Sequence, residues 1–181
     1  MLIEETKLKG SFMIKPKVFV DNRGWFTENF NKKVFNEAIG QHVNFVQDNE
    51  SKSTKGVLRG LHYQTGEYAQ AKLVRVIQGE VLDVIVDLRK DSASFGEYFK
   101  IILSQDNRCQ LFVPKGFAHG FVVLSETAIF SYKCDNYYNK EFESGIKYND
   151  PKLNINWQLP EKELIISDKD QILPNLEQLK L

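Results

Sequence analysis

Short runs rich in valine, isoleucine and phenylalanine recur along the chain between turn-forming residues, a pattern that predicts β-strands. The clearest pair covers residues 72–77 and 81–88, with a turn at 78–80. In the second run every even-numbered position is aliphatic, whereas Asp83 and Asp87 fall on the odd-numbered face. Because side chains alternate between the two faces of a strand, the odd-numbered face is predicted to be wet or to line a site.

The rest of the pattern is also mostly β, with one clear helix. The helix is predicted over residues 31–39, where Asn31 would cap the start and Gly40 would close the end. After Pro151 the pattern is less regular, and Trp157 and residues 164–166 are expected to pack back onto the body. Many short strands with few helices predict an all-β sandwich or jelly roll. Further strands are predicted at residues 12–20, 25–30, 98–104, 110–113, 120–124 and 127–133.

Composition narrows the class of protein. The 181 residues hold no internal repeat or linker-like stretch, which predicts a single domain spanning residues 1–181. Lysine plus arginine number 24, as do aspartate plus glutamate, so the net charge is zero. This balance argues against nucleic acid or a membrane surface as a partner. There is no secretion signal and no apolar run of ~20 residues, and Cys109 and Cys134 are interpreted as reduced thiols, so we expect a cytoplasmic protein.

Three segments carry candidate chemistry: residues 59–64, Lys72 with the glycine seven positions after it, and residues 114–120. Together they resemble the two sequence motifs of cupins, which place a His-x-His pair, an acid and a later histidine around one metal inside a β-barrel. Here Gln64 replaces the second histidine and Lys72 replaces the acid. A charged ammonium repels a divalent cation and has no lone pair to donate, so we predict no metal and no other cofactor.

A metal-free cluster of histidine, lysine, tyrosine and aspartate, here with His62, Lys72 and Tyr132, suits proton abstraction beside a carbonyl. A neutral histidine is a suitable base near pH 7. A lysine stabilises the enolate that forms, a role worth about 3 kcal/mol in comparable sites. Tyr132, on the predicted strand 127–133, would return a proton on the opposite face, although its spacing alone favours an ordinary barrel tyrosine.

These segments, and three others, resemble the dTDP-4-dehydrorhamnose 3,5-epimerase family. The likeness runs from about Phe12 to Pro174 in family order, without a large insertion. It implies a cupin-like jelly-roll β-barrel with a few short helices at its periphery, and a homodimer. It also implies that a dTDP-linked 4-keto-6-deoxy sugar is inverted at the two carbons beside its ketone. The matching segments are Arg59–Gln64, Lys72–Gly79, Val113–Phe121, Asp21–Glu28, Val46–Asn49 and Ser167–Asp170.

The resemblance also implies a role for each matching residue. His62 would be the base, Asp170 its orienting carboxylate, Tyr132 the acid and Lys72 the enolate stabiliser. Asp168 and Asp83 stay open as alternative partners of His62. In the nucleotide-sugar site, Arg23 and Arg59 would hold the pyrophosphate and Phe26 and Tyr138 would flank the thymine. The segment that carries Arg23 would reach across the dimer. The remaining residues implied to line the site are Glu28, Gln47, Asn49, His119, Glu143 and Lys169.

Three alternative functions stay open. A 3- or 5-monoepimerase or a ketoisomerase of a related sugar shares the barrel and the base, but an intact Tyr132 favours the double epimerase. A metal cupin such as a dioxygenase is disfavoured by Gln64 and Lys72. A non-catalytic nucleotide-sugar-binding module would not need His62, Lys72 and Tyr132 together.

Overall fold

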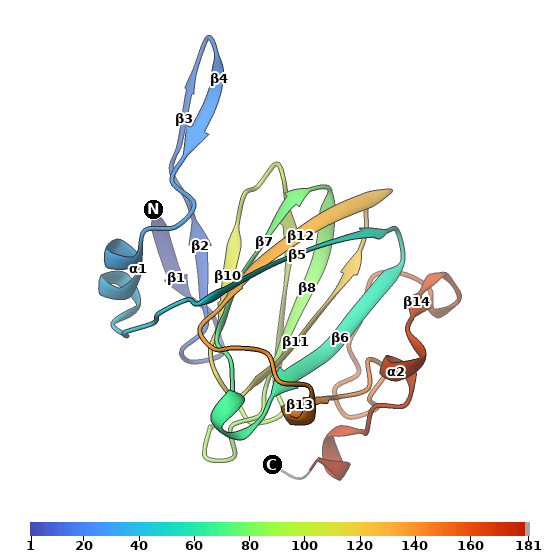
Figure 1. Cartoon of the computed structure of the whole chain (residues 1–181). Helices are drawn as coiled ribbons and strands as arrows, with labels where there is room; N and C mark the ends of the chain where they lie inside the picture. The colour runs from blue at the N-terminus through green and yellow to red at the C-terminus, as the bar shows by residue number, and fades with distance from the viewer. Residues whose placement is uncertain (180–181) are drawn as a thin grey trace.

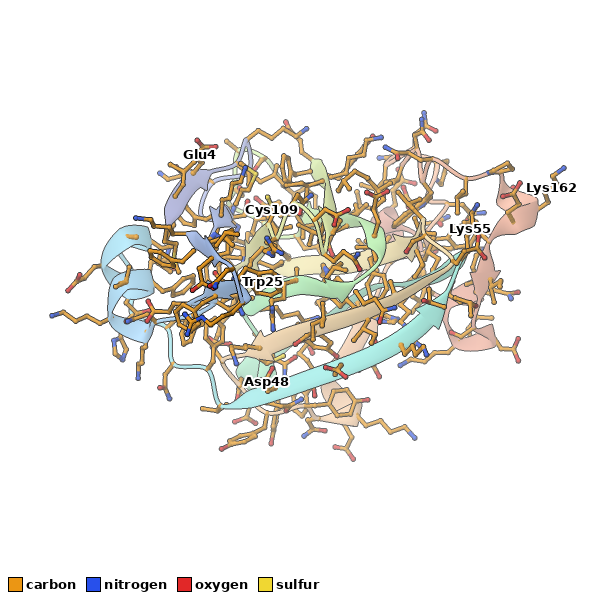
Figure 2. The ribbon with its side chains drawn as sticks, turned by 90° about the horizontal axis from the view of Figure 1, so that it is seen from above. Glu4, Trp25, Asp48, Lys55, Cys109 and Lys162 are labelled. Atoms are coloured by element: carbon orange, nitrogen blue, oxygen red, sulfur yellow. The ribbon has the colours of Figure 1, made fainter. Side chains whose placement is uncertain are left out.

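The computed structural model describes residues 1–179 as two mainly antiparallel sheets that face each other, with a two-stranded arm projecting from one end (Figure 1). The first sheet has the strand order β1-β2-β10-β7-β12-β5, and the second has the order β13-β6-β11-β8-β9 with β14 beside β6. This is the all-β barrel that the sequence predicted, with short helices around it. Figure 2 looks down on the barrel, where Asp48 lies near the start of the edge strand β5 and Lys55 directly follows its end.

The bounds of the elements follow. The first sheet contains β1 (Leu2–Glu5), β2 (Phe12–Lys15), β5 (Gln47–Thr54), β7 (Lys72–Gln78), β10 (Gln110–Val113) and β12 (Thr127–Cys134). The second contains β6 (Val57–Gln64), β8 (Glu80–Asp87), β9 (Tyr98–Ser104), β11 (Phe117–Val123), β13 (Glu143–Gly145) and β14 (Ile165–Ile166). The arm is β3 (Val18–Asp21) and β4 (Gly24–Thr27). The helices are α1 (Lys32–Ile39), α2 (Asp168–Gln171) and the 3₁₀ turns Gly66–Tyr68, Lys140–Phe142, Glu161–Glu163 and Leu176–Gln178.

Strand β8 divides the core into two parts. Its odd-numbered face, with Val81 and Ile85, packs inside the barrel against Val74 and Phe130 of the opposite sheet. Its even-numbered aliphatic face packs outside the barrel against the C-terminal segment, including Trp157. The predicted packing of this segment is therefore confirmed, and each large side chain buried this way contributes roughly 1.5–3 kcal/mol.

The prediction that the odd-numbered face of β8 is wet is wrong, because Asp83 and Asp87 are both fully buried. Each carboxylate is satisfied by protein groups instead of water. Asp83 bonds to His119, whereas Asp87 accepts hydrogen bonds from Arg89 and from two serines in the following loop. Only Asp83 belongs to the site described below.

Helix α1 begins and ends where its caps predicted. The Asn31 side chain accepts a hydrogen bond from the Val34 amide, and Gly40 closes the helix at φ 65°, a left-handed conformation that glycine adopts without strain. The helix buries Phe35 against the ring of Phe112, with centroids 5.3 Å apart in an edge-to-face contact. It therefore covers the outer face of the first sheet, away from the barrel interior.

Several strand predictions differ from the structure. The run 12–20 is two strands, β2 and β3, interrupted at Pro16, which has no N–H to donate to a ladder. Strand β4 ends at Thr27 instead of residue 30, and β11 begins at Phe117, three residues before the predicted start. Strand β5 was not predicted, since its sequence is almost entirely polar.

The arm formed by β3 and β4 stands clear of the barrel (Figure 1). Its side chains are unusually apolar for an exposed hairpin: Phe19 is 52% exposed, Val20 78%, Trp25 59% and Phe26 68%. Near the hairpin turn, the centre of the Trp25 ring lies 4.1 Å from the guanidinium carbon of Arg108. Exposed apolar surface of this kind marks an interaction site. Within residues 1–179, no helix is long and apolar enough to cross a membrane.

Candidate active site

Two glycines bring the motif strands β6 and β11 unusually close. A Cβ on Gly60, whose φ is +114°, would lie 2.7 Å from the Gly120 Cα, and a Cβ on Gly120 would lie 2.7 Å from the Arg59 carbonyl oxygen. No other residue fits at either position without moving backbone. The strand register places His119 directly opposite His62 and then shifts before Phe121. Gly60, two residues before His62, and Gly120, next to His119, therefore allow the close strand approach at which the two histidines are paired.

His62 is bound to Asp170, so the first predicted partner is confirmed as its contact. The His62 Nε2 lies 2.7 Å from Asp170 Oδ1, and the second carboxylate oxygen accepts a hydrogen bond of 3.2 Å from the Gly60 amide. Asp170 is 3% exposed at the short helix α2, whose first amides are capped by Ser167. Asp168 is exposed to solvent and Asp83 bonds elsewhere, so neither alternative holds His62.

Electrostatics favour a charged Asp170. Burial alone would raise the pKa of this carboxyl, but the hydrogen bonds and charges of His62, Gly60 and Lys169 outweigh burial and hold the pKa below its usual range. An ionised carboxylate only accepts hydrogen bonds, so the His62 Nε2 donates. The Nδ1 of a neutral His62 ring then carries the lone pair, as a general base requires.

His119 has a different carboxylate partner. Its Nε2 lies 2.8 Å from Asp83 Oδ2, and among residues 1–179 the other oxygen, Oδ1, has no hydrogen-bond partner. Burial raises the pKa of Asp83, against the lowering effects of His119 and Lys72. Asp83 therefore supports His119 as a fixed group on the cavity wall.

Lys72 and Tyr132 come from neighbouring strands of the first sheet, β7 and β12. The Lys72 Nζ lies 6.0 Å from the centre of the Tyr132 ring. Burial lowers the pKa of Lys72, while the nearby Cys134, Asp83 and Glu143 act in the opposite direction. Burial raises the pKa of the Tyr132 phenol, and Cys134 adds to this effect. Tyr132 therefore keeps its proton at neutral pH and is available as a donor.

These groups surround one cavity of about 540 Å³ between the two sheets. A smaller cavity of about 290 Å³ shares His62, Lys72 and Tyr132 with it. Most of the residues that the sequence predicted for the site line one cavity or the other. The larger cavity is lined by Arg59, His62, Lys72, His119, Tyr132, Lys169 and Asp170. The smaller one adds Gln47, Asn49, Tyr138 and Glu143.

Three predicted site residues lie away from these cavities in the chain. Arg23 and Phe26 are on the exposed arm, where Arg23 pairs with Asp21. Glu28 lines another hollow of about 370 Å³, which shares Tyr132 with the two cavities and does not include His62 or Lys72. None of these three residues lines a cavity that holds His62 or Lys72 in the same chain.

The apolar wall of the larger cavity was missed by sequence reasoning. Phe121 and Phe130 stack there with centroids 4.1 Å apart and planes tilted by 15°. Phe130 lies two residues before Tyr132 on β12, so strand alternation already placed both rings on one face. Phe121 follows Gly120 in a motif that the sequence singled out for its histidine alone.

The rim of the smaller cavity is held by Glu143. Its Oε2 accepts a hydrogen bond of 2.8 Å from the Tyr138 hydroxyl and forms an ion pair with Lys169. Burial opposes ionisation, but Lys169 and Tyr138 outweigh it and hold the pKa of Glu143 below its usual range. The contact joins the loop before the 3₁₀ turn 140–142 to helix α2.

The donor set does not fit a resident metal. No group of three or more His, Cys, Asp or Glu side chains within residues 1–179 is placed to hold an ion. Each cavity histidine is engaged with a carboxylate, and Lys72 occupies the remaining motif position. The cluster instead offers a base, a proton donor and a cation around one space. The absence of a metal in the working protein stays a prediction.

Comparisons with known proteins agree with this geometry. A family model described as dTDP-4-dehydrorhamnose 3,5-epimerase matches residues 5–178. The chain is 54% identical to the Shigella flexneri protein of that name over 170 residues, covering 94% of this chain and 93% of the relative. The crystal structure of the Elizabethkingia anophelis protein of the same name superposes with a TM-score of 0.95 at 55% identity, over 98% of this chain and 97% of that one. A Legionella pneumophila 3,5-epimerase in complex with dTDP-4-keto-L-rhamnose gives a TM-score of 0.94 at 48% identity, over 98% and 94%.

Proposed function

The chain belongs to the dTDP-4-dehydrorhamnose 3,5-epimerase family, and we propose how its residues divide the chemistry of that enzyme. The protein is an isomerase that converts dTDP-4-dehydro-6-deoxy-D-glucose to dTDP-4-dehydro-L-rhamnose by inverting carbons 3 and 5. The cupin-like barrel and the double-epimerase prediction are confirmed, in preference to the narrower epimerases and ketoisomerases. The roles of single residues, the dimer and the absence of cofactors are proposals.

The observation that carries the proposal is the position of the base and the acid on facing sheets. His62 lies on β6 of one sheet and Tyr132 on β12 of the other, and both line the same cavity. Inversion of a carbon requires that a proton leave from one face and return to the other. A sugar ring held between the two sheets would present one face to each group.

In the proposed reaction, His62 removes the proton from the carbon beside the ketone. The electron pair of that C–H bond moves toward the ketone oxygen and forms an enolate, whose negative charge Lys72 stabilises. Tyr132 then gives its proton to the opposite face of the same carbon, and the inverted ketone re-forms. Solvent returns a proton to the Tyr132 phenolate and takes the one on His62, so each turnover leaves the protein unchanged. The second carbon follows the same sequence of steps.

Asp170 would orient the His62 ring and stabilise the imidazolium that forms during the reaction. Because the carboxylate is ionised and held by Gly60 as well, it does not need to reorganise as the ring gains charge. Lys72 acts in a cavity with the apolar wall of Phe121 and Phe130, where a fixed charge acts more strongly than in water.

We also propose that two chains complete each site. The arm places Arg23 and Phe26 far from the cavity of their own chain, with 68% of Phe26 exposed. In a homodimer the arm would cover the cavity of the partner subunit, where a guanidinium suits the diphosphate and an aromatic ring suits the base. Arg59, held at 3.1 Å to the Ser53 hydroxyl, would meet the diphosphate from within the chain.

Proton exchange with solvent tests the proposed division of roles. The substrate is incubated with the protein in deuterated water and followed by NMR. Deuterium at both carbon 3 and carbon 5, with inversion at each, is the expected result. Exchange at one carbon only would contradict two-centre catalysis by this set of residues.

A further inference from the structure

Gln64 stands where the cupin motif has its second histidine, and its side chain serves a different purpose here. The residue is 6% exposed, and its Oε1 accepts a hydrogen bond of 3.0 Å from the Asn139 amide. Asn139 ends the loop of residues 135–139, which follows β12 and carries Tyr138. A position that would otherwise serve a metal therefore fixes a loop at the rim of the smaller cavity.

A second glutamine holds the same loop at its other end. Gln70 is 8% exposed, and its Nε2 donates a hydrogen bond of 2.8 Å to the Asn136 carbonyl. The carboxylate of Asp135 in turn accepts a hydrogen bond of 2.6 Å from the Ala71 amide. Hydrogen bonds from buried amide side chains to backbone are lost completely when the side chain is truncated, because no water replaces the partner.

Between these anchors, Tyr138 is fixed at both of its own ends. Its backbone amide donates a hydrogen bond of 3.1 Å to Gln47 Oε1, and its hydroxyl donates one of 2.8 Å to Glu143. The ring is nevertheless 51% exposed. An aromatic ring whose backbone and hydroxyl are both held, and whose face is open, is a prepared surface for stacking.

We propose that Gln64 and Gln70 are positioning residues for the nucleobase, and that they hold the Tyr138 loop in its binding conformation before the nucleotide arrives. The inference rests on the proposed role of Tyr138 beside the thymine. Fixing a loop in advance transfers the cost of ordering it from binding to folding, which strengthens affinity without touching the ligand. Neither glutamine belongs to the acid, base or enolate-stabilising set, so their effect falls on binding and not on turnover.

The test is Gln64→Met, which keeps the length of the side chain and removes the acceptor. We expect the Kd for dTDP, measured by calorimetry, and the KM of the substrate to rise about tenfold, with kcat within about twofold of the unmodified protein. Gln70→Met removes the other anchor and is expected to give the same pattern. Gln105→Met is the matched control, since this amide accepts from the Gly79 backbone at a turn outside the two cavities and should leave the dTDP affinity unchanged.

A double substitution shows whether Gln64 acts through Tyr138. Tyr138→Ala alone should weaken dTDP binding, and adding Gln64→Met to it should cause no further loss. If Tyr138→Ala leaves the dTDP affinity unchanged, the proposed role of Tyr138 is wrong. If Tyr138→Ala weakens binding while folded Gln64→Met and Gln70→Met proteins bind dTDP normally, the loop inference alone is overturned. A fall in kcat that matches the rise in KM would also overturn it.

Discussion

His62 and His119 lie directly opposite each other on β6 and β11, yet each ring is bound to a different buried carboxylate. Hydrogen bonds and positive charge hold the pKa of Asp170 below its usual range, whereas burial raises the pKa of Asp83. Asp170 is ionised and also accepts a hydrogen bond from the Gly60 amide, so it can stabilise the charge of an imidazolium at His62. This partner agrees with the proposed role of His62 as the base.

The cation of Lys72 is expected to act on the reaction more than on nucleotide binding. Lys72→Met keeps much of the side-chain volume and removes the charge beside the ketone oxygen. We expect kcat to fall about a hundredfold or more, with the Kd for dTDP changed little. Steady-state kinetics and calorimetry measure the two quantities. Lys52→Met, an exposed lysine on β5, is the control, and near-normal turnover in Lys72→Met would show that the lysine is structural.

Chelation should leave the activity intact. Lys72 stands at the position of the acidic ligand, and His62 and His119 are each held by a carboxylate. We expect elemental analysis of the purified protein to find no stoichiometric transition metal. We also expect turnover after extensive dialysis against a chelator to match that of untreated protein. One zinc or iron per chain, with activity lost on its removal and restored on its return, contradicts this prediction.

Much of the fold followed from the sequence because its strands are strongly patterned. The alternation over residues 81–88 predicted strand β8, and Asn31 and Gly40 predicted the two ends of α1. Strand β5 escaped prediction because it is a polar edge strand whose order comes from pairing with β12. The buried state of Asp87 was also missed, although its side-chain donors lie only two to seven positions further along the chain.

The candidate catalytic cluster was predicted through motifs and the family resemblance, which gave Asp170 as the partner of His62 and left Asp83 and Asp168 open. Only the folded chain decides between them, because it shows Asp170 against His62 and Asp83 against His119. Gln64 was interpreted as a lost metal ligand, and its bond to the loop of Tyr138 has no signature in local sequence. Long-range partners of this kind depend on strand order, which spacing along the chain does not specify.

The Asp87 cluster should make the barrel sensitive to acid. Burial opposes ionisation, but hydrogen bonds from Arg89, Ser92 and Ser94 lower the pKa of Asp87 from 3.8 to about 2. A carboxyl whose folded pKa is depressed stabilises the fold above its unfolded pKa and loses that contribution as the pH falls through the folded value. The contribution is roughly 2 kcal/mol at neutral pH and should disappear between about pH 4 and pH 2.

Urea unfolding at pH 7 and at pH 3 measures this contribution. Asp87→Asn should lower the free energy of unfolding at pH 7 by roughly 2 kcal/mol or more, and by less at pH 3, because the unmodified protein has already lost part of the contribution there. Asp91→Asn, at an exposed position in the same loop, serves as the control. An equal loss at both pH values would indicate a packing effect instead of an ionisation effect.

If each active site draws residues from both chains of a homodimer, the activity of mixed dimers can be predicted quantitatively. If the arm covers the cavity of the partner subunit, a mixed dimer of His62→Ala and Arg23→Ala chains has one site with both defects and one with neither. Random pairing makes half of the dimers mixed, so co-expression should restore about a quarter of the normal activity. Light scattering should also report a dimer. Should the arm serve its own chain, every site carries one defect and co-expression restores nothing.

The base and the acid are separated by their effects on solvent exchange. His62→Ala removes the group that takes the proton, so both inversion and exchange of substrate protons with deuterated water should be lost. Tyr132→Phe leaves His62 and Asp170 in place, so deprotonation and return of a proton from the same side continue. This variant should therefore exchange substrate protons for deuterium while it forms little inverted product. NMR follows the exchange and the inversion together, and circular dichroism establishes that both variants are folded. A merely destabilised protein would lose exchange and inversion in parallel. If the base and the acid act from facing sheets, Tyr132→Phe loses inversion and keeps exchange. Equal loss of exchange in both variants would mean that Tyr132 positions the substrate or stabilises the enolate beside Lys72, and the two-face mechanism would be wrong.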